Sequence, residues 1–249
     1  MAFGLEERQL SSTAGHSIEE LRGEARSRAL AVEVLEADVA QAEDVQRVLG
    51  HVLQVFGRVD GLVNNAAIGP LGTVLDTSEA DFDRIVAVNL RGPYLTSRAV
   101  LPHFIAQGGG AIVNIGSGAG WGKHNMAVYS ATKAAVHGLT MAMAYDHFAQ
   151  RVRVNLVIPG GGGIITGMSL GRTGGDVAKA AAGPGTVAGR PATGDDVAKV
   201  VAFLLSNDAE VISGTVVDVG CFAGQGGPWY ALQDASAQPL PTALTRLGP

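Results

Sequence analysis

The amino-acid sequence predicts an α/β fold in which a doubly wound, mostly parallel sheet lies between two layers of helices. Short apolar segments alternate along the chain with longer segments whose apolar residues recur at helical spacing. The short segments are apolar on both faces, as strands are when helices cover both sides of a sheet. Parallel strands need long connections between them, so this alternation favours parallel pairing over hairpins.

Strands are expected in short runs rich in Val, Leu, Ile and Ala. In chain order these runs are residues 29–34, 61–65, 111–115, 153–158 and 214–219. Ligands of doubly wound sheets bind beyond the carboxyl ends of the strands. Polar residues that directly follow a strand are therefore the first candidates for a functional site.

Helices are expected over residues 44–56, 80–104, 126–150 and 195–205. In the first of these, apolar residues three or four positions apart share one face. The second is expected to break near Gly92 and Pro93, because proline has no backbone N–H to continue the helical bonding. Segments 173–189 and 235–249 are rich in small residues and are predicted to be loop or tail.

The composition excludes several classes of protein. The net charge is −5 and there is no Lys/Arg block of the kind that tracks phosphates along a nucleic acid. No apolar run is long enough to span a bilayer, and the first ten residues lack the pattern of a signal peptide. The histidines show no metal-ligand spacing, so no metal site is expected. These observations predict a cytoplasmic protein that binds neither nucleic acid nor membrane.

Tyr129 and Lys133 carry the first chemical signal. They are four residues apart in YSATK, near the start of a predicted helix, so their side chains share one face. An ammonium group near a phenol favours the phenolate and lowers the tyrosine pKa. A tyrosine adjusted in this way can exchange a proton near neutral pH.

Other polar residues fall where a site of this kind would need them. Ser117 directly follows the predicted strand 111–115, and its hydroxyl could hydrogen-bond a substrate oxygen that Tyr129 protonates. Asn89 lies inside a predicted helix, where asparagine is unfavourable. Its amide could hold a water or a backbone group. Asn65 ends a strand, as Asp38 and Val39 end the segment before it.

Together these motifs resemble the short-chain dehydrogenase/reductase family over about residues 21–224, in the family's order. The matching segments are LEADV, DGLVNNAA, VNLRGPY, IVNIGSGAG, YSATK, RVRVNLVIPG and the stretch from GRPATG to VVDVG. The resemblance implies a Rossmann-like fold and hydride transfer between NAD or NADP and a carbonyl or alcohol carbon. The small-molecule substrate itself is not indicated.

The resemblance also implies roles for individual residues. Tyr129 would be the general acid/base, and Lys133 would lower its pKa and hold the nicotinamide ribose. Ser117 would orient the substrate oxygen, and Asn89 would position a water that connects Lys133 to solvent. The residues implied to contact the cofactor are Asp38, Val39, Asn65, Tyr129, Lys133, Ile164 and Thr166.

The sequence departs from the family at its start. The family opens with a strand and a glycine-rich T-G-x-x-x-G-x-G turn, which lets the cofactor pyrophosphate approach backbone N–H groups at a helix N-terminus. The first thirty residues hold no such element, so the first strand–helix unit is missing from the predicted fold. Three explanations are open: the natural chain is longer, the protein has diverged, or another segment replaces the turn. Residues 220–226 fit the turn's spacing, but an ordinary C-terminal tail is favoured there.

The sequence predicts one Rossmann-like domain over residues 1–227, incomplete at its N-terminus, and a tail over residues 228–249. The resemblance implies a homodimer or homotetramer. Two functions are weighed: an NAD(P)-dependent oxidoreductase that uses Tyr129, and a non-redox or cofactor-free descendant that acts as a divergent catalyst or an interaction subunit. The second is motivated by the missing turn.

Overall fold

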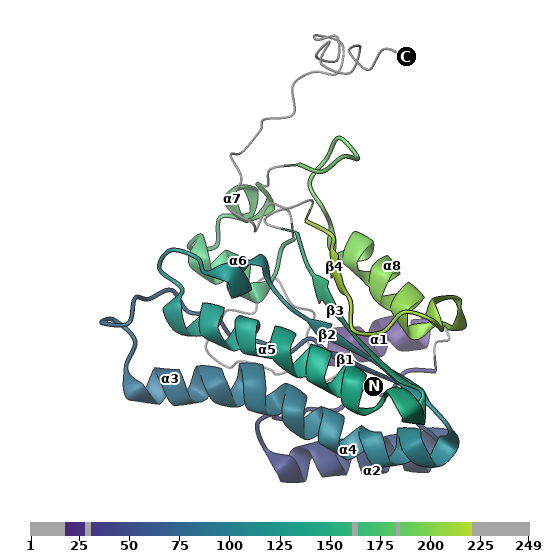
Figure 1. The fold of residues 1–249 in the computed structure, drawn as a ribbon. Coiled ribbons are helices and arrows are strands. Elements are labelled where there is room, and N and C mark those ends of the chain that lie inside the picture. The colour runs from purple at the N-terminus through teal and green to yellow at the C-terminus, as the bar shows by residue number, and fades with distance from the viewer. Residues whose placement is uncertain (1–17, 28–30, 161–163, 183–184, 221–249) are drawn as a thin grey trace, which may run out of the picture.

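A parallel four-stranded sheet forms the centre of the computed structural model of this chain, which describes residues 18–27, 31–160, 164–182 and 185–220 (Figure 1). The strands are β1 (Gly61–Asn64), β2 (Gly110–Ile115), β3 (Val152–Ile158) and β4 (Val216–Asp218). They are hydrogen-bonded in the order β1-β2-β3-β4, and every pair is parallel. The carboxyl ends of all described strands therefore lie at one edge.

Helices cover both faces of this sheet, with α4 and α5 on one side and α8 on the other (Figure 1). The α-helices are α1 (Ile18–Ser27), α2 (Ala42–Phe56), α3 (Glu79–Val86), α4 (Gly92–Gln107), α5 (Ala127–Asp146), α6 (Gly167–Arg172), α7 (Val177–Ala181) and α8 (Gly194–Leu205). Short segments of other helical types are η1 (Ala87–Arg91), η2 (Gly118–Trp121), η3 (Phe148–Gln150) and η4 (Asn207–Ala209). This three-layer arrangement is the predicted fold class.

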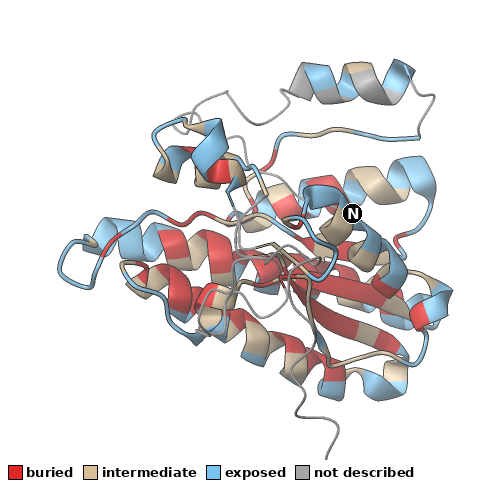
Figure 2. Ribbon diagram, turned by 90° about the horizontal axis from the view of Figure 1, so that it is seen from above, coloured by how far each residue is buried: buried red, intermediate tan, exposed pale blue. Residues whose placement is uncertain are grey.

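Burial follows the layers. Figure 2 shows the buried residues concentrated in the strands and on the inward sides of the helices. Leu62, Ile112 and Leu156, one from each of the first three strands, have no solvent exposure. Each such side chain contributes about 1.5–3 kcal/mol to folding. The apolar alternation of the sequence therefore builds the core that holds the strand ends in place.

Several predicted elements differ from the structure. Residues 31–34 of the predicted first strand have no strand partner among the described residues and are mostly exposed, so no strand forms there. The predicted helix 80–104 is helical throughout, but a π-helical turn (η1) interrupts it just before Gly92. The helix predicted to end at residue 150 ends at Asp146, and part of the predicted loop 173–189 is helix α7. The predicted tail, residues 228–249, lies outside the described residues.

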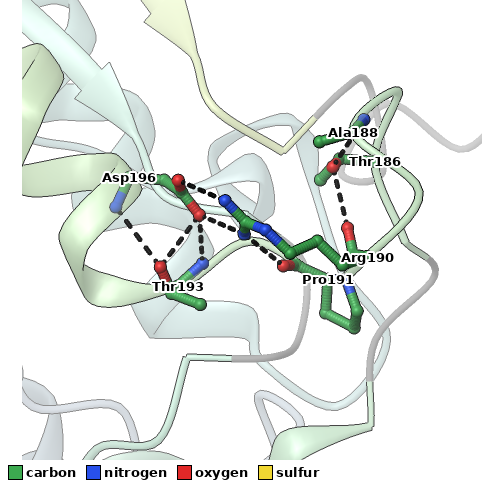
Figure 3. A network of polar contacts seen from close by, with 6 residues as sticks. All are labelled: Thr186, Ala188, Arg190, Pro191, Thr193 and Asp196. Carbon is green, nitrogen blue, oxygen red and sulfur yellow. Dashed lines mark hydrogen bonds and ion pairs between the residues drawn. The ribbon is translucent and has the colours of Figure 1, made fainter.

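Helix α8 is held at its start by a charged clamp (Figure 3). Thr193 and Asp196 form a capping box, in which each side chain accepts from the other residue's backbone N–H. Arg190 binds both carboxylate oxygens of Asp196, at 2.6 and 2.8 Å. These hydrogen bonds, led by that with Arg190, hold the pKa of Asp196 far below its usual range. The clamp fixes the entry of the chain into the layer that covers β2 and β3.

A buried network of amides and hydroxyls joins α4, β1, β2 and α5. Asn64 and Asn114 face each other in the register of β1 and β2, and the Asn64 amide donates to Asn114 Oδ1 at 2.8 Å. Asn114 donates in turn to Thr140 Oγ1 at 2.9 Å, and Thr96 donates to Asn64 Oδ1 at 2.6 Å. Because each of these polar side chains has a partner, the network can remain in the dry core.

Replacing Asn114 by alanine should destabilise the protein by about 2–4 kcal/mol, because it leaves buried polar groups of Asn64 and Thr140 without their partner. Urea unfolding followed by circular dichroism measures this change. The exposed Asn207→Ala variant is the control and should stay within about 0.5 kcal/mol of the wild type. A loss below about 1 kcal/mol for Asn114→Ala would contradict the network's proposed contribution.

Candidate active site

Asn89 lies in the π-helical turn and uses its whole side-chain amide. Its Oδ1 accepts from the backbone N–H of Ile68 at 2.8 Å, and its Nδ2 donates to the Ile68 carbonyl at 2.8 Å and to Thr132 Oγ1 at 3.1 Å. The side chain is 1% exposed. Asn89 therefore connects the loop after β1 to helix α5. A water or a backbone group was expected as the partner of its amide, and the structure shows the backbone of Ile68. The π-helical turn, a feature frequent at functional sites, allows this orientation.

Lys133 is anchored at the carboxyl end of β2. Its Nζ donates to the Ile115 carbonyl at 2.8 Å, and the residue is 4% exposed. Burial lowers the pKa of Lys133 to about 8, because the interior disfavours its charged form. The ammonium lies 5.8 Å from the centre of the Tyr129 ring.

Tyr129 lies one helical turn before Lys133 and is buried against Ala119 and Met126. Burial raises the pKa of Tyr129, while a hydrogen bond with Ser117 and the charge of Arg172 act in the opposite direction. The pKa of Tyr129 is therefore raised overall, whereas a net lowering was expected. Desolvation of the phenol is the larger effect, because the ring lies in an apolar cluster.

Ser117 occupies the position predicted for it, directly after β2. Its Oγ accepts from the backbone N–H of Ala119 at 3.1 Å, so it also caps the short helix η2. Its interaction with Tyr129 brings the two hydroxyl groups together. Ser117, Tyr129 and Lys133 thus lie together at the carboxyl edge of the sheet. Asn89 contacts helix α5, which carries Tyr129 and Lys133, through its hydrogen bond to Thr132.

The structure adds a residue that the sequence did not single out. Arg172, the last residue of α6, has its guanidinium carbon 5.4 Å from the centre of the Tyr129 ring. It donates to the Gly69 carbonyl from Nε at 3.1 Å and from Nη2 at 2.6 Å. The only sequence signal was a lone arginine among small and apolar residues after the fourth predicted strand.

The remaining cofactor candidates lie on separate segments of the same structure. Val39 and Asn65 both line a small cavity of about 10 Å³ beside Gly92. Asp38 lines a larger polar hollow of about 680 Å³ and accepts from the Ala40 N–H at 2.8 Å. Thr166 caps helix α6 by accepting from Ser169 N, and the Ile164 carbonyl accepts from the Ser169 hydroxyl. No hydrogen bond joins Asp38, Ile164 or Thr166 to the four predicted catalytic residues within the described part of the chain.

The donor set near Tyr129 fits the ribose end of a nicotinamide dinucleotide. An ammonium group has three N–H donors, and Lys133 uses one of them on Ile115. The other two, with the Tyr129 hydroxyl, suit a pair of adjacent sugar hydroxyls. The residues present are therefore compatible with the predicted cofactor at this position.

The described residues bear on two expected absences, a metal site and a membrane-spanning helix. There, no group of three or more His, Cys, Asp or Glu side chains is arranged to hold a metal ion. No helix in that part of the structure has the length and apolar character needed to cross a membrane.

Comparison with known proteins supplies the family. The family model described as enoyl-(acyl carrier protein) reductase matches residues 10–221. The chain is 40% identical to 2-(S)-hydroxypropyl-CoM dehydrogenase 3 of Xanthobacter autotrophicus over 197 residues, which are 77% of this chain and 74% of that protein. It is 46% identical to an uncharacterized oxidoreductase of Thermotoga maritima, but that match covers about half of each protein, 48%.

A solved structure agrees with these matches. The NADH complex of 3-ketoacyl-(acyl-carrier-protein) reductase from Brucella melitensis superposes with a TM-score of 0.65 and 34% identity, covering 74% of this chain and 75% of that one. The chain belongs to the short-chain dehydrogenase/reductase family, a class of NAD(P)-dependent oxidoreductases. The predictions of family, fold class, enzyme class and nicotinamide cofactor are thereby confirmed.

The buried charge of Lys133 should appear in the pH dependence of stability. Its pKa is lower in the folded than in the unfolded protein, so the unfolded state binds more protons between about pH 8 and 10.5. The free energy of unfolding should therefore gain about 2–3 kcal/mol from this group between pH 7 and 10. Lys133→Met should lack that gain.

Urea unfolding of both proteins at pH 7, 8, 9 and 10 measures the difference. Lys179→Met is the control, because the Lys179 side chain is 74% exposed and should leave the wild-type pH dependence unchanged. Parallel curves for the wild type and Lys133→Met would show that the Lys133 ammonium is not desolvated in solution.

Proposed function

We propose that this protein interconverts a secondary alcohol and a carbonyl compound, with Tyr129 as the general acid/base. The observation that carries the proposal is the meeting of Ser117, Tyr129 and Lys133 at the carboxyl edge of the sheet. A tyrosine is protonated at neutral pH, and burial raises the pKa of Tyr129 further in favour of this form, which donates to a carbonyl oxygen. The family's nicotinamide cofactor supplies or accepts the hydride when bound.

Ser117, Lys133 and Asn89 each have a distinct part in this proposal. Ser117 orients the substrate oxygen through its hydroxyl, which already interacts with Tyr129. Lys133 holds the ribose hydroxyls and stabilises the negative charge that forms on Tyr129 when the proton leaves. Asn89 is a positioning residue that acts through Ile68 and Thr132, and both of its amide protons are already donated to these protein groups.

The other cofactor contacts are divided between the two ends of the dinucleotide. Asp38, Val39 and Asn65 are proposed to hold the adenine side, and the polar hollow of about 680 Å³ that Asp38 lines supports this for Asp38. Ile164 and Thr166 are proposed to border the nicotinamide, because they follow β3 and precede α6. Either NAD or NADP is compatible with this assignment.

We also propose that residues 1–227 form one domain, and that the protein is a cytoplasmic homodimer or homotetramer. Exposed aromatic side chains on and after α5 support the oligomer. Tyr145 is 86% and Phe148 77% exposed, and aromatic residues are enriched at contacts between proteins.

Tyr129→Phe should lower kcat/KM by about 10²–10⁴-fold, because it removes the hydroxyl that exchanges the proton. The assay follows NADH and NADPH absorbance with a panel of secondary alcohols and ketones, and circular dichroism checks folding. Tyr145→Phe, on the exposed side of the same helix, is the matched control and should retain wild-type activity. Wild-type turnover by Tyr129→Phe would exclude the proposed mechanism.

Calorimetric titration with NADH and NADPH separates this function from a non-redox descendant. Micromolar binding of either supports the oxidoreductase and identifies the preferred cofactor. A folded chain that binds neither at millimolar concentration would favour the non-redox function for the chain by itself.

A further inference from the structure

Arg172 brings a second positive charge to Tyr129 that the proposed reaction does not require. Its guanidinium carbon lies 5.4 Å from the centre of the phenol ring, and the Lys133 ammonium lies 5.8 Å from the same point. Two cations therefore lie close to the ring whose hydroxyl is to meet the substrate. Lys133 has a part in the proposed reaction, whereas Arg172 has none.

No acidic side chain among the described residues forms an ion pair with Arg172. Other arginines, such as Arg58 and Arg190, form ion pairs with nearby aspartates. Within the described residues, Arg172 forms no ion pair, and its hydrogen-bond acceptor is the neutral carbonyl of Gly69. A partly buried charge without a counterion is unfavourable, so such a site favours an anion that binds there.

The geometry of Arg172 leaves one end of the guanidinium open. A guanidinium has five N–H donors in a flat fork. Nε and Nη2 donate to Gly69, while Nη1 has no acceptor among the described residues. The end of the fork formed by Nη1 and Nη2 is the part that binds a carboxylate, sulfonate or phosphate through two parallel hydrogen bonds.

The protein holds Arg172 at this place by close packing. A Cβ atom on Gly69 would lie 2.5 Å from Arg172 Nη2, 2.8 Å from Tyr129 Cδ2 and 3.0 Å from Met168 Sδ. A side chain at position 69 would therefore displace at least one of these three groups. Glycine at this position lets the guanidinium lie beside the tyrosine.

We propose that Arg172 is a specificity-determining residue that binds an anionic group of the substrate, so that the substrates are ketones or secondary alcohols carrying a carboxylate, sulfonate or phosphate-like group. The inference rests on the proposed function, because it assumes that the substrate oxygen meets Tyr129. It goes further by giving the substrate a charge. An anion held by the fork would fix the carbonyl relative to the tyrosine hydroxyl.

Matched ketones test the proposal. Acetoacetate, acetonylsulfonate and acetonylphosphonate share a methyl ketone with the neutral 4-hydroxy-2-butanone, so their differences distinguish the three anions. The measured quantity is kcat/KM for each anionic ketone divided by kcat/KM for the neutral one, with NADH and with NADPH. For the wild type this ratio should exceed about tenfold for at least one anion.

Arg172→Met keeps the length and apolar packing of the side chain but loses the charge, and it should reduce the ratio by about tenfold or more. Arg172→Lys retains the charge without the fork and should restore part of the preference. Arg58→Met removes an exposed arginine far from Tyr129 in sequence, and it should leave the ratio unchanged. Equal losses for charged and neutral ketones in Arg172→Met would overturn the proposal, since that result describes a structural clamp or an effect on Tyr129 alone.

Calorimetric titration with the same anionic ketones keeps the test independent of turnover. Binding to the wild type that is lost in Arg172→Met supports the anion site even if no reaction occurs, and in that case it is the proposed function that fails. An active wild type with no preference for any anionic ketone would overturn the inference and leave the proposed function intact. A wild type that neither turns over nor binds these anions would overturn it as well.

Discussion

The site depends on one buried amide. The Asn89 side chain accepts from the backbone N–H of Ile68 and donates to the Ile68 carbonyl. Its second amide proton is donated to Thr132 on helix α5. These bonds join the loop after β1 to the helix that carries Tyr129 and Lys133. Breaking them in a site that is 1% exposed would leave several polar groups without partners, so the arrangement is strongly favoured. The neighbouring residue Gly69, which supports Arg172, is placed by the same contact.

Electrostatics around Tyr129 follow from burial more than from pairing. The phenol pKa is raised and the Lys133 pKa is lowered, each because the interior disfavours the charged form. Ser117 and Arg172 oppose the change on the phenol. An apolar surrounding of this kind strengthens any charge interaction made within it. A bound anion or a developing phenolate would therefore be stabilised by the two cations more than it would be at the surface.

Stability and chemistry share the carboxyl edge of the sheet. The network of Asn64, Asn114 and Thr140 fixes β1 and β2 against α4 and α5, close in the chain to the loops that carry the site. At the opposite face, the Arg190–Asp196 clamp holds the start of α8. The network and the clamp both consist of hydrogen bonds, which are directional. They therefore fix the orientation of the helices relative to the strands more closely than apolar packing alone would. Catalytic geometry needs that precision at the strand ends.

The sequence by itself determined the alternation of strands and helices, because periodic apolar residues act locally and β2, β3 and α2 needed no further information. It also determined Tyr129, Lys133, Ser117 and Asn89 as candidates, since their spacing matches one family's motifs. The pairing of strands could not be predicted in the same way. Residues 31–34 have strand-like composition but no strand partner among the described residues, and composition alone does not determine which strands pair. The direction of the Tyr129 pKa and the place of Arg172 were decided only by the tertiary structure. Desolvation depends on what surrounds a group, and Arg172 meets Gly69 across a long separation in the chain.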